Sequence, residues 1–209
     1  MSHYCIVINL DRCTGCFGCE VSCKMENGVA LGDHWRKVFT VGPVGEYPNL
    51  TRYALPTMCQ QCQDAPCVKV CPTGASYRDP ENNIVLVNKE QCIGCMYCMM
   101  ACPYGVRSYN KKENCVEKCT LCGHLTSAGK LPACVKSCAA GAQFYGDLDD
   151  PESDVSKELA KYDESQIHTL MDVGNMPATK YIMTEVIGDW QERLTPNEYP
   201  QTAAYPVSE

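Results

Sequence analysis

The sequence lacks several features that would point to membranes or nucleic acids. No run approaches the about 18 consecutive apolar residues of a membrane-spanning helix, so none is predicted. The net charge is −7, and no cluster of lysine and arginine interleaves with aromatic residues, which argues against nucleic acid or an anionic membrane surface as a partner. The opening MSHYCIVINLDRC has neither a basic and apolar signal peptide nor a twin-arginine pair. We therefore expect the partners to be proteins.

Apolar residues other than cysteine are also few. The hydrophobic share of 45% includes 18 cysteines among 209 residues, and about 36% is left without them. That share is low for a chain that must bury a full core, so something besides aliphatic packing must hold the fold together. The length allows one sizeable domain or two small ones.

Sixteen of the eighteen cysteines fall into four groups of four. In chain order, the groups are Cys13, Cys16, Cys19, Cys23; Cys59, Cys62, Cys67, Cys71; Cys92, Cys95, Cys98, Cys102; and Cys119, Cys122, Cys134, Cys138. Groups one and three are the unmodified C-x2-C-x2-C-x3-C run of bacterial [4Fe–4S] ferredoxins, and groups two and four are expanded versions of it. Cys5 and Cys115 lie outside the groups and are expected to be small buried hydrophobic residues.

The order of the groups indicates two nested pairs of clusters. Groups two and three are close together, as in a two-cluster ferredoxin, and groups one and four enclose them. The fourth cysteine of each run is expected to bind the other cluster of its pair. This rule predicts four ligand sets: Cys13, Cys16, Cys19 and Cys138; Cys23, Cys119, Cys122 and Cys134; Cys59, Cys62, Cys67 and Cys102; and Cys71, Cys92, Cys95 and Cys98.

We therefore expect an α+β fold made of two nested bacterial-ferredoxin-like modules, with short strands and helices and a core stabilised by four [4Fe–4S] clusters. Residues 1–50 together with 111–150 would form the module of groups one and four. Residues 51–110 would form the module of groups two and three, and residues 151–209 a C-terminal extension that packs on this body and on a partner.

Regular secondary structure is sparse in the pattern of residues. Candidate strands cover residues 4–9, 84–87 and 181–187. One longer helix is predicted over residues 152–162, with Val155, Leu159 and Tyr162 on one face and Ser153 or Asp154 as its N-cap. Packing of that face on its own domain is the favoured interpretation, and docking of a partner is the alternative.

Zinc is the main alternative to iron, because C-x2-C is also the commonest half of a zinc site. Four cysteines within eleven residues crowd one loop, which favours a larger polynuclear centre. An oxidised [4Fe–4S] cluster with four thiolates carries a charge of about −2, so cations near the ligands could tune its reduction potential. Five are candidates, with a solvated surface position as the equal alternative: Lys24, Lys69, Arg107, Lys118 and Lys136.

The motifs CTGCFGCEVSCKMEN, CQQCQDAPCVKVCPTGA, CIGCMYCMMACPYGVRSYN, CTLCGHL with PACVKSCAAGA, and FYGDLDDPESDVSK resemble one family. It is the four-cluster iron–sulfur subunit of molybdopterin oxidoreductases of the dimethyl sulfoxide reductase family, and the resemblance covers residues 4 to about 185. The resemblance implies a subunit without catalytic chemistry of its own. It would relay electrons between a large catalytic subunit, which holds molybdopterin with Mo or W, and a second redox partner.

That second partner would be a membrane-anchor, quinone-reactive subunit or a soluble electron donor. A free-standing polyferredoxin carrier is the alternative function, and a zinc-stabilised interaction module is a third. Because clusters are assembled in the cytoplasm, we expect a cytoplasmic location, with co-export to the periplasm or outer membrane face beside a signal-bearing partner as the alternative. The sequence does not identify the substrate of the complex.

Overall fold

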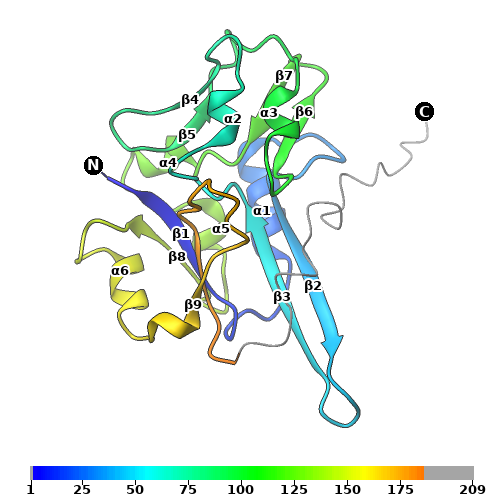
Figure 1. The fold of residues 1–209 in the computed structure, drawn as a ribbon, viewed down its shortest axis with the longest axis vertical. Coiled ribbons are helices and arrows are strands. Elements are labelled where there is room, and N and C mark those ends of the chain that lie inside the picture. The colour runs from blue at the N-terminus through cyan, green and yellow to red at the C-terminus, as the bar shows by residue number, and fades with distance from the viewer. Residues whose placement is uncertain (1, 186–209) are drawn as a thin grey trace.

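A computed structural model describes residues 2–185, except for the side chain of Val44. Its central element is a four-stranded sheet with the strand order β8-β1-β10-β9 (Figure 1). The bounds of these strands are β1 Tyr4–Asn9, β8 Gln143–Asp147, β9 Ile167–His168 and β10 Lys180–Ile182. Strand β1 pairs antiparallel with β8 and parallel with β10, so the first strand joins segments from the second half of the chain.

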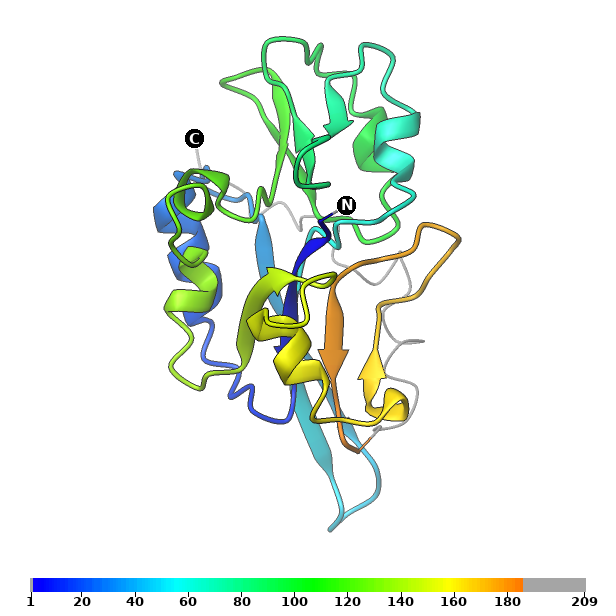
Figure 2. The same cartoon turned by 90° about the vertical axis from the view of Figure 1, so that its left-hand side faces the viewer.

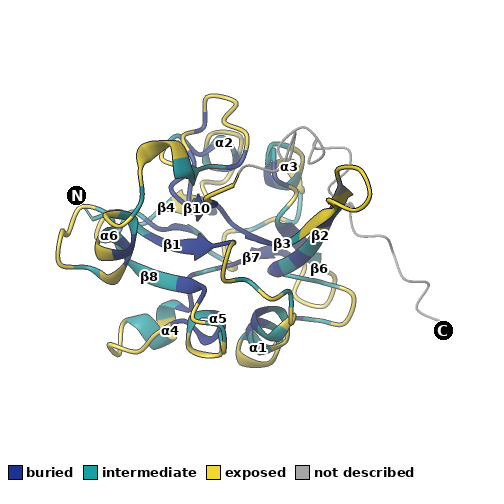
Figure 3. Ribbon diagram, turned by 90° about the horizontal axis from the view of Figure 1, so that it is seen from below, coloured by how far each residue is buried: buried dark blue, intermediate teal, exposed yellow. Residues whose placement is uncertain are grey.

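Three two-stranded antiparallel hairpins complete the strands. They are β2 Arg36–Val44 with β3 Thr51–Met58, β4 Ser76–Arg78 with β5 Val85–Val87, and β6 Arg107–Asn110 with β7 Cys115–Lys118. The hairpin of β2 and β3 is the longest, and its tip projects from the rest of the molecule (Figures 1 and 2). The tip is exposed, whereas the far half of β3 is buried (Figure 3).

The helices are short and most of them begin inside the cysteine groups. Their bounds are α1 Gly18–Asn27, α2 Pro66–Lys69, α3 Tyr97–Met100, α4 Gly123–Thr126, α5 Ala133–Lys136 and α6 Asp154–Leu159, with a 3-10 turn, η1, at Glu164–Gln166. Helix α1 is the longest and buries Cys19 and Cys23, which are four residues apart and therefore share a face. None of the helices within residues 2–185 is long and apolar enough to cross a bilayer.

Helices α1 and α3 begin in the same way. The residue before each helix, Phe17 or Met96, has a left-handed backbone with φ of 60°. Two residues earlier, Gly15 and Gly94 have φ of 66° and 67°. Matching backbone angles at matching places in C-x2-C-x2-C show that both runs form the same loop, which turns the chain from the first two cysteines into the helix that carries the third.

The buried core mixes cysteine with aliphatic side chains, and strand β1 lies at its centre (Figure 3). A smaller apolar cluster lies on the other face of β1, where Cys5 and Val7 pack against Val155 and Leu159 of α6. The face predicted for this helix thus packs on its own domain. Ser153 caps the helix as predicted, since its side chain accepts a hydrogen bond from the Ser156 amide.

Several other predictions can be compared with these elements. The mixture of helices and short strands agrees with the α+β class, and the strands predicted at residues 4–9 and 84–87 are present as β1 and β5. The helix predicted over 152–162 is shorter, at Asp154–Leu159, and the expectation that it would be the one longer helix was wrong because α1 is longer. Of the strand predicted over 181–187, residues up to Ile182 lie in β10, and those beyond 185 are outside the described residues.

The predicted domain limits stay a prediction, and two of them can be located on the secondary structure. The limits at residues 50 and 110 fall between the two strands of a hairpin, β2 with β3 and β6 with β7. Within the predicted extension, residues 167–182 contain two strands of the central sheet, β9 and β10.

We predict that Gly94→Ala destabilises the protein more than Gly74→Ala. The two glycines have φ of +67° and +68°, so both variants carry the cost of a left-handed alanine, about 1 kcal/mol. A Cβ on Gly94 would also lie 2.9 Å from the Asn114 Oδ1 atom, while one on Gly74 would meet nothing within 4 Å. We expect a total loss of about 2–3 kcal/mol at Gly94. Thermal unfolding followed by circular dichroism under anaerobic conditions would measure this, and equal losses would contradict it.

Candidate metal centres

All eighteen cysteines lie within the described residues, and none forms a disulfide. Three cavities are each lined by four cysteines from the groups. We call them site 1 (Cys13, Cys16, Cys19, Cys138), site 3 (Cys59, Cys62, Cys67, Cys102) and site 4 (Cys71, Cys92, Cys95, Cys98). Each encloses about 310–330 Å³ of unfilled space, part of it open to solvent.

The remaining four group cysteines also lie together, and we call them site 2 (Cys23, Cys119, Cys122, Cys134). Burial raises the pKa of the Cys23 thiol strongly, and the nearby thiols of Cys119, Cys134 and Cys122 raise it further. The Asn27 amide nitrogen lies 3.7 Å from the sulfur of Cys23 and 3.6 Å from that of Cys122. The four sites are therefore the same four sets that the cross-ligation rule predicts, although binding of iron to them stays a prediction.

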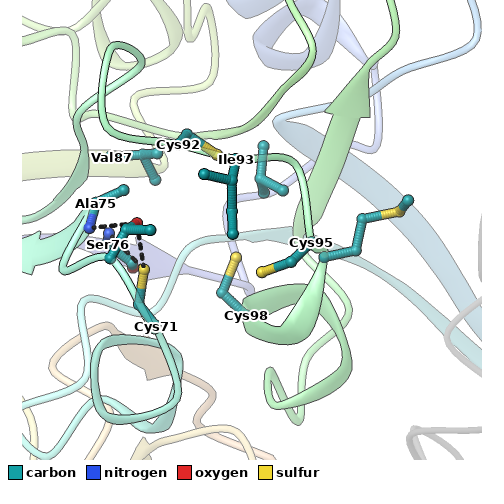
Figure 4. Close-up of a pocket in the computed structure, with 11 residues that line it drawn as sticks. Cys71, Ala75, Ser76, Val87, Cys92, Ile93, Cys95 and Cys98 are labelled. Atoms are coloured by element: carbon teal, nitrogen blue, oxygen red, sulfur yellow. Dashed lines mark hydrogen bonds between the residues drawn. The ribbon is translucent and has the colours of Figure 1, made fainter.

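In site 4, two segments of the chain place four thiols around one cavity (Figure 4). Cys92 and Cys95 lie on the loop before α3, Cys98 lies on α3, and Cys71 reaches the same cavity from the turn after α2. The Cys71 sulfur accepts a hydrogen bond from the Ser76 amide at 3.3 Å. Burial acts to raise the pKa of this thiol, but donors led by that amide outweigh it and lower the pKa below the usual value.

Site 1 repeats this arrangement. Cys138 comes from the turn after α5, and its sulfur accepts a hydrogen bond from the Ala142 amide, also at 3.3 Å. Cys13 and Cys16 lie on the loop before α1, and Cys19 lies on that helix. Sites 1 and 4 are thus built alike, with three thiols from one run and a fourth that a backbone amide holds in place.

Site 3 is covered by a segment far away in the sequence. The buried Asn175 side chain donates to the Cys62 sulfur at 3.0 Å and to the Tyr104 hydroxyl at 2.7 Å. Tyr104 in turn donates to the Met171 carbonyl, and Asn175 accepts a hydrogen bond from the Val173 amide. Every hydrogen-bonding atom of the Asn175 side chain is therefore used, which locks this loop over the site.

The sites are poorly suited to free thiolates without a metal. The pKa of the Cys62 thiol is raised to about 12, chiefly by burial and against the lowering effect of the Asn175 amide. Burial, followed by the Cys134 thiol, likewise raises the pKa of Cys119 to about 12. Four thiolates can share such a site only if positive charge is placed among them, and iron supplies that charge.

The number of thiols at each site fits an iron–sulfur cluster. A [4Fe–4S] cluster takes one thiolate on each of its four iron atoms, and each of sites 1 to 4 brings four thiols together. Zinc would also take four thiolates, about 2.3 Å from a single centre, so the measured iron and zinc contents distinguish the two.

Buried cations fit the same anionic group. The side chains of Arg36 and Arg107 are buried, and Nε and Nη2 of Arg36 and Nη1 of Arg107 have no hydrogen-bond acceptor within residues 2–185. Buried N–H groups without acceptors are costly, and here they lie beside the cysteine thiols. The sulfide atoms of a cluster are the acceptors that such donors would need.

The five cations that were candidates for tuning the reduction potentials differ in how far they are buried. Arg107 and Lys118 are buried. Lys69 and Lys136 are exposed, and Lys24 instead donates to the carbonyls of Ala30 and Asp33 after α1. Arg36 and Asn175 were not anticipated, because nothing in the local sequence indicates that an arginine at the start of a strand, or an asparagine in the C-terminal extension, is buried beside a thiol.

Comparisons with known proteins show one matching family and several similar proteins. The 4Fe-4S dicluster domain family matches residues 50–148. The chain is 41% identical to a protein of Halobacterium salinarum that is named as a dimethyl sulfoxide reductase iron–sulfur subunit, over 89% of this chain and 81% of the relative. It is 36% identical to a subunit of the sulfite dehydrogenase of Allochromatium vinosum, over 87% and 83%. It is 34% identical to the arsenate respiratory reductase iron–sulfur subunit of a Shewanella strain, over 85% and 94%.

We predict that Asn175→Leu destabilises the protein by about 1–3 kcal/mol, because the variant removes the hydrogen bonds to Cys62 and Tyr104 and leaves a buried hydroxyl without its donor. The control is Asn49→Leu, in the exposed tip of the hairpin of β2 and β3, where the change should stay within about 0.5 kcal/mol. Anaerobic thermal unfolding of both variants would test this. Similar losses for the two would mean that the network around Asn175 does not hold the loop.

Proposed function

The chain belongs to the iron–sulfur subunits of the dimethyl sulfoxide reductase family of molybdopterin oxidoreductases, and from this premise we propose that it carries four [4Fe–4S] clusters as an electron relay. The observation that supports this most directly is the gathering of sixteen thiols into sites 1 to 4. When bound, each cluster accepts and releases one electron at a time. The chain makes and breaks no bond in a substrate.

The order of the relay is site 1, site 2, site 3 and site 4. Neighbouring sites are close enough for the thiols of one to add to burial in raising the pKa of a thiol in the next. Cys19 of site 1 raises the pKa of Cys134 in site 2. Cys59 of site 3 raises that of Cys119 in site 2, and Cys67 of site 3 raises that of Cys98 in site 4. This proximity supports an unbroken chain of four sites, in which sites 1 and 2 belong to the proposed outer module and sites 3 and 4 to the inner one. In Figure 2 the segments of the inner pair lie above the central sheet.

Two partners would contact opposite ends of this relay. Around site 1, Phe17, Val21 and Met25 form an exposed apolar row along α1, since they are spaced four residues apart. Around site 4, Ile93, Tyr97 and Met100 are exposed apolar side chains on α3 and the loop before it. Exposed apolar rows beside the two end sites are what protein contacts need. One partner would be the large molybdopterin subunit with Mo or W, and the other a membrane-anchor subunit or soluble redox protein.

Isolation of the tagged chain from its native cells under anaerobic conditions tests this function. We expect about 16 iron atoms per chain, together with a stoichiometric large subunit that contains Mo or W. The same iron content on an isolated 23.1 kDa chain would instead support a free-standing polyferredoxin carrier. Zinc in place of iron would rule out both functions.

We predict that the iron lost from a double cysteine variant depends on which sites its two cysteines belong to, and not on their sequence groups. Cys71→Ala with Cys92→Ala removes two ligands of site 4, so one cluster is lost and about 12 iron atoms stay. Cys71→Ala with Cys67→Ala removes ligands from sites 4 and 3, so two clusters are lost and about 8 iron atoms stay. The control Cys5→Ala lies outside the sites and keeps all the iron. Equal iron contents in the two double variants, measured by elemental analysis, would refute the cross-ligation.

A further inference from the structure

A buried arginine lies between site 1 and site 2. Arg36, the first residue of β2, is only 2% exposed. Its Nη1 donates to the sulfur of Cys134 in site 2 at 3.4 Å, and it also interacts with the thiol of Cys19 in site 1. An arginine guanidinium is effectively never deprotonated in proteins. Arg36 therefore stays charged and faces both sites.

A second buried arginine occupies the matching place in the inner pair. Arg107, the first residue of β6, is 4% exposed and lines the cavity of site 3. It interacts with Cys67 and Cys59 of site 3 and with Cys98 of site 4. Its Nη2 donates to the Ser76 hydroxyl at 3.0 Å, and Ser76 itself lines site 4. Arg107 thus faces sites 3 and 4 as Arg36 faces sites 1 and 2.

A buried lysine lies between the two pairs. Lys118, the last residue of β7, is 2% exposed. Its Nζ donates to the carbonyl of Cys119, a residue of site 2, at 2.7 Å. It also donates to the carbonyl of Val85, a residue that lines the cavity of site 3. Carbonyl oxygens carry only partial charges, so they neutralise this ammonium incompletely.

None of these three cations has a carboxylate partner among the ion pairs found within residues 2–185. A buried cation without an anion costs several kcal/mol. All three lie beside sites 1 to 4, and anionic clusters in those sites would balance their charge.

We propose that Arg36, Lys118 and Arg107 form a row of three buried cations that alternates with the four clusters, each cation shared by the two clusters beside it. This inference rests on the proposed function, because it needs all four clusters. An added electron makes a cluster more negative, and a nearby cation stabilises that reduced state and raises its reduction potential. A shared cation stabilises the electron on either side of it, so the electron can move between neighbours without losing that stabilisation. One cluster is oxidised and its neighbour reduced, and no bond or proton changes.

The test replaces each cation by methionine in the intact complex and measures the four midpoint potentials by anaerobic redox titration followed by electron paramagnetic resonance. One double cysteine variant for each site assigns its potential: Cys13→Ala with Cys138→Ala for site 1, Cys23→Ala with Cys119→Ala for site 2, Cys59→Ala with Cys102→Ala for site 3, and Cys71→Ala with Cys92→Ala for site 4. Arg36→Met should lower the potentials of sites 1 and 2, Lys118→Met those of sites 2 and 3, and Arg107→Met those of sites 3 and 4. We expect each affected reduction equilibrium to fall at least tenfold, about 59 mV for one electron.

Two sets of controls separate charge from structure. Asn175→Leu removes a donor to the sulfur of Cys62 in site 3, and the other hydrogen bonds of that side chain go to Tyr104 and Val173, so it should shift the potential of site 3 only. Arg36→Lys, Lys118→Arg and Arg107→Lys keep the charge, should retain all iron, and should shift the same two sites by less than methionine does. These charge-retaining variants keep the inference testable where a methionine variant loses clusters.

The pattern of affected sites decides the outcome. Equal shifts of all four potentials, shifts at one site only, or a site affected by both Arg36→Met and Arg107→Met would overturn the row of shared cations while leaving the relay intact. Fewer than about 16 iron atoms in the unmodified complex would overturn the proposed function itself, and this inference with it.

Discussion

The convergence of four thiols at each site is the constraint on which the rest of the fold depends. Site 1 needs Cys138 beside Cys13, and the antiparallel pairing of β1 with β8 meets this need, because Asn9 at the end of β1 binds the carbonyl of Ala142 just after Cys138. The hairpin of β6 and β7 links the inner sites to the outer ones, since Cys102 of site 3 precedes it and Cys119 of site 2 follows it. The strands are short because their task is to bring the ligand loops together, and they do not need to enclose a large aliphatic core.

The ligand loops also hold backbone conformations that would otherwise be unfavourable. Phe17 and Met96 are not glycine, yet both have left-handed angles, which costs about 1–2 kcal/mol each. Such a cost persists only where the surroundings determine the conformation. Here the thiols on either side of each residue must point into one cavity, and attachment of three consecutive cysteines to one cluster would hold the turn. The exposed side chain of each residue then faces solvent, where a partner can meet it.

The sequence predicted what depends on spacing and missed what depends on three-dimensional burial. The cysteine intervals predicted the four sets of thiols, and β-branched residues predicted β5. Helix α1 was missed because its cysteines obey the ligand interval, which hides the helical period of Phe17, Val21 and Met25. The hairpin of β2 and β3 carries glycine and proline, which weaken the signal of a strand. Arg36 could not be anticipated, since arginine is almost always exposed unless it is paired, and its partners come from two distant cysteine groups.

Charge links the folding of this chain to the filling of its sites. Without clusters, Arg36, Arg107 and Lys118 would be buried cations with no ionised partner within residues 2–185, because burial keeps thiols such as Cys62 and Cys119 neutral. With clusters, each site carries about −2 and balances the cations beside it. The free energy of cluster binding is then also free energy of folding. The inner pair spans residues 59–102, whereas the outer pair must join residues 13 and 138, so the shorter loops of the inner pair cost less entropy to close. We therefore expect the inner module to form first and to offer the Val85 carbonyl as an acceptor for Lys118 when the outer module closes on it.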